Sequence, residues 1–132
     1  MEQLICDGSA VLAAIAGDHQ DMMARIDHIQ GLMHEEPSDI LVIVGALEDL
    51  VTATSAHFDR ENALMEDESD EEFVLHKTDH RYLLYYIRCF TAAIRSGEVA
   101  PSMELALDLD GWLHFHTERF DVRLLKRLEQ QQ

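Results

Sequence analysis

Two stretches, HFDRE at residues 57–61 and HKTDH at residues 76–80, indicate how this chain folds. In each of them two potential metal ligands lie four residues apart, His57 with Glu61 and His76 with His80. Residues four apart on an α-helix lie one above the other, with Cβ atoms about 6 Å apart, so each pair presents two donor groups on one side of a helix. The spacing predicts two helices that direct metal ligands at a common point.

A third stretch, HTERFD at 116–121, carries His116 and Asp121 five residues apart. At 3.6 residues per turn this spacing rotates the carboxylate by about 140° from the imidazole, so we expect Asp121 to reach sideways, as a bridge between two metals requires. His19 completes a set of five imidazoles and two carboxylates. That set exceeds the needs of one four-coordinate zinc and suits two octahedral ions sharing bridging oxygens, for which iron is the natural candidate.

Helical periodicity covers four blocks of the chain, and no stretch alternates as a strand does. We therefore expect an all-α fold, an up-down-up-down four-helix bundle with the di-iron site in its core. The inward stripes run as follows: Leu12, Ile15, His19, Met22, Ile26, Ile29 and Met33; Ile43, Leu47, Leu50, Thr54, His57, Glu61 and Leu64; Phe73, His76, His80, Leu83 or Leu84, Ile87 and Ile94; Leu105, Leu109, Trp112, His116, Phe120 and Leu124.

The ends of these helices also have sequence signals. Ser38 is the expected N-cap of the second helix, Ser96-Gly97 the end of the third, and Ser102 the cap of the last. Residues 1–132 form a single domain, in which residues 1–17 are a candidate N-terminal arm because Gly17 is a poor residue for a continuous helix.

The charge of the chain argues against two classes of partner. Ten basic residues against 26 acidic residues give a formal net charge of −16, which repels nucleic acid and anionic membrane surfaces. The one basic cluster, at 119–127, is interpreted as a solvated helix face. No apolar run approaches the roughly 20 residues of a membrane helix, so no membrane insertion is expected. With two cysteines and no signal peptide, we expect a cytoplasmic protein.

Two carboxylates on the inward stripes carry the metal interpretation. The alternative is that the inward histidines and acids are ordinary core groups, and for a single histidine that alternative is preferred. However, a carboxylate in an apolar core costs several kcal/mol unless it is paired or binds a metal, so Glu61 and Asp121 each require a partner. Seven coincident ligands favour a metal.

The spacing resembles that of a known family, the hemerythrins, and within it the bacterial oxygen-binding hemerythrins. The resemblance rests on H-F-x-x-E at 57–61, H-x-x-x-H at 76–80 and W-L-x-x-H-x-x-x-x-D at 112–121, and it covers most of the chain. In the first helix, His19 with Met22, Ile26 and Asp27 resembles the family pattern H-x-x-L-x-x-x-I-N. His28 is the rival ligand there, but it lies half a turn away from the apolar stripe, so His19 is preferred.

The resemblance implies which residues bind the iron ions and which small molecule the iron ions bind. One iron is held by His76, His80 and His116, the other by His19 and His57, with Glu61, Asp121 and an oxo or hydroxo group as bridges. Dioxygen binds reversibly at an open position of the second iron. The implied pocket residues are Met22, Phe58, Trp112, Leu113 and Thr117.

Thr117 departs from the family, which usually places a bulky aliphatic residue directly after this histidine. A threonine there adds a hydroxyl and removes volume close to the open position. We therefore hypothesise faster autoxidation, which Thr117→Ile should slow.

The resulting expectation is a protein for oxygen sensing, delivery or storage, not an enzyme, that also accepts small ligands such as azide or nitric oxide. One alternative is a di-iron redox enzyme that reduces peroxide or nitric oxide, although such enzymes commonly use more carboxylate ligands. Another is a metal-stabilised signalling module, whose metal holds the helices together. A fused or separate signalling partner is compatible with the oxygen-sensing interpretation.

Overall fold

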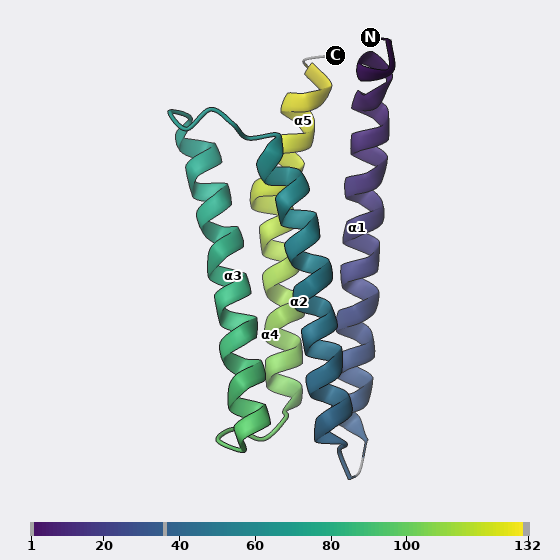
Figure 1. Ribbon diagram of the computed structural model, residues 1–132, viewed down its shortest axis with the longest axis vertical. Coiled ribbons are helices and arrows are strands. Elements are labelled where there is room, and N and C mark those ends of the chain that lie inside the picture. The colour runs from purple at the N-terminus through teal and green to yellow at the C-terminus, as the bar shows by residue number, and fades with distance from the viewer. Residues whose placement is uncertain (1, 36, 131–132) are drawn as a thin grey trace.

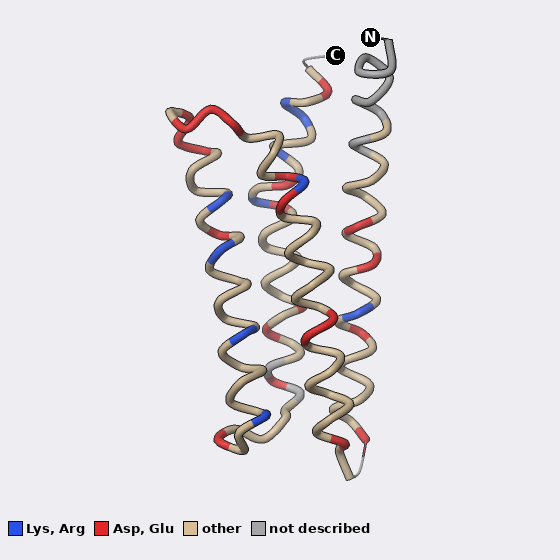
Figure 2. Tube along the Cα trace, viewed as in Figure 1, with Lys and Arg blue, Asp and Glu red and all other residues tan. Residues whose placement is uncertain are grey.

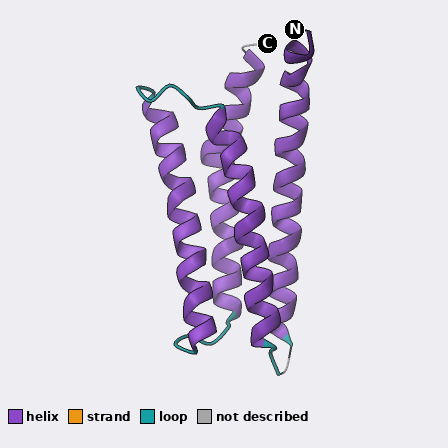
Figure 3. Cartoon of the chain, in the orientation of Figure 1, coloured by secondary structure: helices purple, strands orange, loops and turns teal. Residues whose placement is uncertain are grey.

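Four helical segments lie side by side in a computed structural model that describes residues 2–35 and 37–130. Successive segments run in opposite directions, and the two ends of the chain lie at the same end of the molecule (Figure 1). The helices are α1 (Glu2–His34), α2 (Ile40–Ala63), α3 (Glu71–Ser96) and α4 (Met103–His116). The last segment continues from α4 through a π-helical turn, η1 (Thr117–Asp121), into α5 (Val122–Gln130). The described residues contain helices and no strand (Figure 3), which confirms the all-α prediction.

Helix α2 begins one residue later than the sequence predicted. The Asp39 carboxylate, not the Ser38 hydroxyl, accepts the Val42 N–H at 3.2 Å. The Ser38 hydroxyl instead donates to the Glu35 carbonyl at 3.1 Å. Both residue types are good N-caps, so the loop conformation decided between them, and the prediction of Ser38 was wrong.

Helix α3 has both of its ends defined by local chemistry. The Asp70 carboxylate accepts the backbone N–H groups of Glu72 and Phe73 at 3.0 and 3.2 Å. At the other end Gly97 adopts φ 82°, a left-handed conformation that costs glycine little, and its N–H bonds the Ile94 carbonyl. The predicted end at Ser96-Gly97 is confirmed.

Most apolar residues of the predicted stripes whose side chains are described are buried in the core, whereas Leu64, Phe73 and Trp112 are half-buried. Leu64 is the C-cap of α2, and the next residue, Met65, is fully buried instead. Helix α2 ends at Ala63, so the helical spacing that predicted an inward position for Leu64 no longer applies there. Leu12 and Leu105 lie outside the side chains that the structure describes. Helix α1 passes through Gly17 without a break.

Helix α2 is, among the described residues, the one helix long and apolar enough by composition to cross a membrane. A core helix of a soluble bundle passes the same test, so this is weak evidence for a span. The buried face of α2 carries His57 and Glu61, both at or below 1% exposure.

Charged residues join the last segment to the start of α3. Acidic residues gather in the α2–α3 loop, and Lys and Arg lie on α3 and near the C-terminus (Figure 2). Arg119 pairs with Glu72 and Arg127 with Asp70, each at 2.8 Å. Arg127 also lies 4.3 Å from the ring centre of Phe73. The basic cluster is therefore not simply a solvated face, because its arginines hold η1 and α5 against α3.

Candidate metal centre

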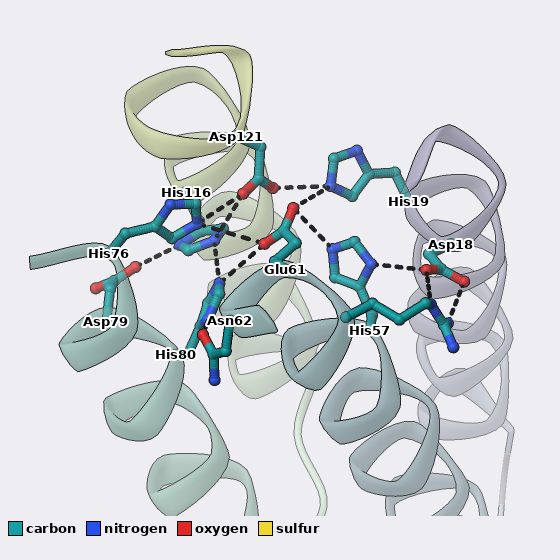
Figure 4. Close-up of polar contacts among 11 residues, drawn as sticks. Asp18, His19, His57, Glu61, Asn62, His76, Asp79, His80, His116 and Asp121 are labelled. Carbon is teal, nitrogen blue, oxygen red and sulfur yellow. Dashed lines mark hydrogen bonds and ion pairs between the residues drawn. The ribbon is translucent and has the colours of Figure 1, made fainter. Parts of the chain in front are cut away.

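All seven predicted ligands meet in one layer of the bundle, nearer the end that contains the α2–α3 loop (Figures 1 and 4). Helix α1 supplies one of them, and the other three segments supply two each. Six are almost fully buried, while the side chain of His19 retains 16% exposure. By segment, the residues are His19 from α1, His57 and Glu61 from α2, His76 and His80 from α3, and His116 and Asp121 from the last segment.

The donor atoms form two overlapping groups. Within each group the ligand atoms lie within 4.8 Å of one another, and both groups contain Glu61 and Asp121. Besides these two carboxylates, the first group contains three histidines and the second contains two. The histidines of the first group are His76, His80 and His116, and those of the second are His19 and His57. The residues present therefore fit a metal ion, and each of the two groups could hold one.

Several of the donor atoms lie close enough together to share a metal ion. With metal–ligand bonds of about 2.1 Å, neighbouring ligands of an octahedral ion are about 3.0 Å apart. The His80 Nε2 atom lies 3.0 Å from a Glu61 oxygen, and the Nε2 atoms of His76 and His116 lie 2.9 and 3.1 Å from Asp121 Oδ1. In the second group, His19 Nε2 is 2.7 Å from Asp121 Oδ2 and His57 Nε2 is 3.3 Å from Glu61 Oε2.

The turn that contains Asp121 differs from the expected geometry. A regular α-helix was expected to rotate Asp121 by about 140° from His116. The structure instead widens this turn into the π-helix η1, in which the Val122 N–H bonds the Thr117 carbonyl five residues earlier. The extra residue in the turn returns Asp121 to the face of His116, so the carboxylate reaches the cluster without stretching sideways.

Three polar residues outside the predicted ligand set orient the histidines. The Nδ1–H of His57 donates to Asp18 at 2.9 Å, and Arg60 binds both oxygens of Asp18. The Nδ1 atom of His80 lies 2.8 Å from the Asn62 amide oxygen. In the same way Asp79 lies 2.6 Å from the Nδ1 atom of His116. Figure 4 shows these contacts around the cluster.

Each orienting residue is adjacent in sequence to a predicted ligand but supports a histidine on the next helix. Asp18 precedes His19 and supports α2, Asn62 follows Glu61 and supports α3, and Asp79 precedes His80 and supports α4. Sequence reasoning missed all three. Their position beside ligands was a usable signal, but their partners depend on how neighbouring helices are rotated.

These contacts leave the inner nitrogens available for a metal. A carboxylate oxygen only accepts, so Asp18 and Asp79 fix a proton on the Nδ1 atoms of His57 and His116 and aim Nε2 inward. Several buried atoms have no hydrogen-bond partner of acceptable geometry among the described residues: His19 Nε2, His57 Nε2, both Glu61 oxygens and Asp121 Oδ2. Unpaired nitrogen and carboxylate atoms facing one another fit cations lying between them.

The buried carboxylates and histidines of the cluster shift one another's pKa values. Burial alone would raise the pKa of Glu61 and Asp121, but the surrounding histidines outweigh it and hold both pKa values far below their usual range. Burial would lower the pKa of His116, but hydrogen bonds to Asp121 and Asp79 raise it to about 9. For His80, burial and the neighbouring histidines lower the pKa to about 4. A metal ion would replace the protons that remain on the histidines.

Aromatic side chains cover one side of the cluster. The Phe58 ring stacks on His80 with centroids 3.8 Å apart, and the Trp112 ring stacks on His116 at 4.8 Å. Met22 and Leu113 are buried one turn from His19 and His116 respectively. Of the predicted pocket residues, Phe58 and Trp112 thus contact histidines of the cluster, and Thr117 is the half-buried first residue of η1.

The remaining histidines lie away from the cluster. His28, His34 and His114 are all exposed, as the sequence predicted for residues off the core stripes. The exposure of His28 supports the preference for His19 in the first helix.

Comparisons of the chain with protein-family models, curated proteins and solved structures find no match.

Proposed function

We propose that this chain is a non-haem di-iron protein that binds dioxygen reversibly, as its resemblance to the hemerythrins implies. The observation that carries the proposal is the pair of overlapping donor groups that share Glu61 and Asp121. Carboxylates common to both groups are suited to bridge two ions. Iron would supply the redox chemistry that dioxygen binding requires.

The unequal size of the two donor groups supports different roles for the two proposed ions. His76, His80 and His116 give one ion three nitrogen ligands, whereas His19 and His57 give the other two. With the same bridging groups on both, the ion held by two histidines has one coordination position fewer filled by the protein. That position is the proposed place for dioxygen.

The ligand chemistry favours binding over oxidation of a substrate. Di-iron enzymes of helical bundles commonly surround the metals with carboxylates, whereas here five of the seven protein ligands are neutral imidazoles. Phe58, Trp112 and Leu113 give an apolar wall that limits access of water and protons. Both features support reversible binding of a small molecule that is not chemically altered.

The decisive experiment combines iron counting with a visible spectrum. The purified protein is reduced without air, exposed to dioxygen and then deoxygenated, and iron is counted per chain. We expect two irons per chain and a charge-transfer band that appears with dioxygen and disappears on its removal. Immediate and permanent conversion to the ferric form, or fewer than two irons, would contradict the proposal.

Two histidines on α1 provide a matched pair of variants. His19→Ala should remove a ligand of the two-histidine ion, lower the iron content towards one per chain and abolish the band. The matched variant His28→Ala alters an exposed histidine on the same helix and should change neither. The reverse result would assign the first-helix ligand to His28.

A further inference from the structure

A pocket opens between α3 and α4, the neighbouring helices whose backbones make the fewest close approaches. It has a volume of about 230 Å³ and is lined mainly by apolar and aromatic side chains. Its lining consists of Tyr82, Leu83, Tyr86, Asp108, Leu109 and Trp112. This outer pocket opens to the surface, where the side chain of Tyr82 is 72% exposed.

A second, inner cavity lies one helical turn from the metal ligands. Each of the four helical segments contributes to its lining a residue that lies three positions along the chain from a histidine ligand. These residues are Met22 (from His19), Thr54 (from His57), Leu83 (from His80) and Leu113 (from His116). Three residues of helix rise about 4.5 Å, so this cavity occupies the layer directly beside the histidines. Its volume of about 10 Å³ is at the lower limit for one water-sized molecule.

The two spaces share a wall. Leu83, Leu109 and Trp112 line both the outer pocket and the inner cavity, so these residues lie between the two spaces. The Trp112 ring reaches from this wall to His116, on which it stacks. These three side chains are therefore the ones whose movement would join the outer pocket to the layer beside the ligands.

We propose that small neutral molecules reach the metal centre through the outer pocket, past the gate formed by Leu83, Leu109 and Trp112, and pause in the inner cavity. This proposal rests on the proposed function, because it identifies the access path to that same site. The apolar gate selects against ions, which would lose their hydration in passing it. The net charge of −16 further disfavours anions at the mouth.

Thr54 gives an independent indication that the inner cavity receives a molecule. It is the polar residue of that lining, and its buried hydroxyl has no hydrogen-bond partner among the described residues. By contrast, the buried Thr91 hydroxyl donates to the Ile87 carbonyl at 2.7 Å. A hydroxyl left free in this way can donate to a small ligand during its passage.

The test compares two adjacent leucines on α3. Leu83 belongs to the gate, whereas Leu84 packs against the core and lines neither space. Leu83→Ala should raise the association and dissociation rate constants for dioxygen by the same factor, about three- to tenfold, and leave Kd within twofold. Truncating a gate residue lowers the barrier to entry and to exit alike, and Leu83 is not one of the metal ligands, so the affinity at the metal should stay the same. Leu84→Ala should leave both rate constants unchanged.

Stopped-flow mixing of the reduced, iron-loaded protein with dioxygen measures these constants. Equal rate constants in wild type and Leu83→Ala, or equal acceleration in both variants, would overturn the gate. Truncation of a buried leucine can prevent folding, in which case the milder pair Leu83→Val and Leu84→Val tests the same direction with a smaller factor.

A second measurement separates this inference from the proposed function. Trp112 is the single tryptophan of the chain, so its fluorescence reports dioxygen at the gate without any metal. Collisional quenching of the metal-free protein by dioxygen should increase in Leu83→Ala and remain constant in Leu84→Ala. An unchanged quenching constant in Leu83→Ala would overturn the access path, whereas absent oxygen binding at iron would overturn the proposed function instead.

Discussion

Asp79 illustrates how one residue outside the ligand set can tune the cluster. Its carboxylate lies 2.6 Å from His116 Nδ1, the closest of the three contacts that orient histidines from behind. Asp18 is shared with Arg60, which offsets its charge, and Asn62 is neutral. Among these three, Asp79 would therefore give its histidine the strongest electron donation towards a bound metal.

Asp79→Asn should weaken metal binding by about tenfold, within the 10–100-fold range found for such supporting groups. The amide oxygen can still accept the hydrogen bond from His116 Nδ1, so the substitution removes the negative charge and keeps the hydrogen bond. Competition with a chelator of known affinity measures the loss. Asp59→Asn, an exposed change on α2, is the matched control, and equal affinities of the two variants would contradict the role of Asp79.

At the level of elements, two local choices shape the helices. The π-helical turn η1 places Asp121 beside His116, and the Asp39 cap sets where α2 begins. Neither follows from hydrophobic periodicity, because a stripe is compatible with a start one residue earlier and with a regular turn. Both were decided by hydrogen bonds available in the folded chain.

Asp39→Ala should lower the free energy of unfolding by about 1 kcal/mol, since the Val42 N–H at the start of α2 loses its side-chain acceptor. Ser38→Ala, at the position first expected to be the cap, should cost clearly less. Urea unfolding followed by circular dichroism measures both values. A larger cost for Ser38→Ala would restore the sequence-based assignment.

For the whole molecule, the buried charges make the stability of the metal-free protein depend on pH. The raised pKa of His116, about 9, contributes stability that is complete below about 6.5 and is lost as the pH rises through 9. The lowered pKa of His80, about 4, contributes stability that is present above 6.5 and is lost as the pH falls towards 4. We therefore expect greatest stability near neutral pH.

Urea unfolding midpoints of the chelator-treated protein between about pH 5 and pH 10 test this expectation. Metal-loaded protein is the control. Its histidines carry no protons on Nε2, so its alkaline loss of stability should disappear. A metal-free protein whose stability keeps rising up to pH 10 would show that His116 is not held protonated by Asp79 and Asp121.

The sequence by itself determined the helices, their inward faces and the seven side chains that meet, because helical periodicity and ligand spacing are local properties. Tertiary structure decided which oxygen faces which nitrogen, and it paired Asp18, Asn62 and Asp79 with histidines on neighbouring helices. It also decided the widened turn at Asp121 and the gate between the two cavities. These features depend on the rotation and offset of packed helices, which no spacing within a single helix specifies.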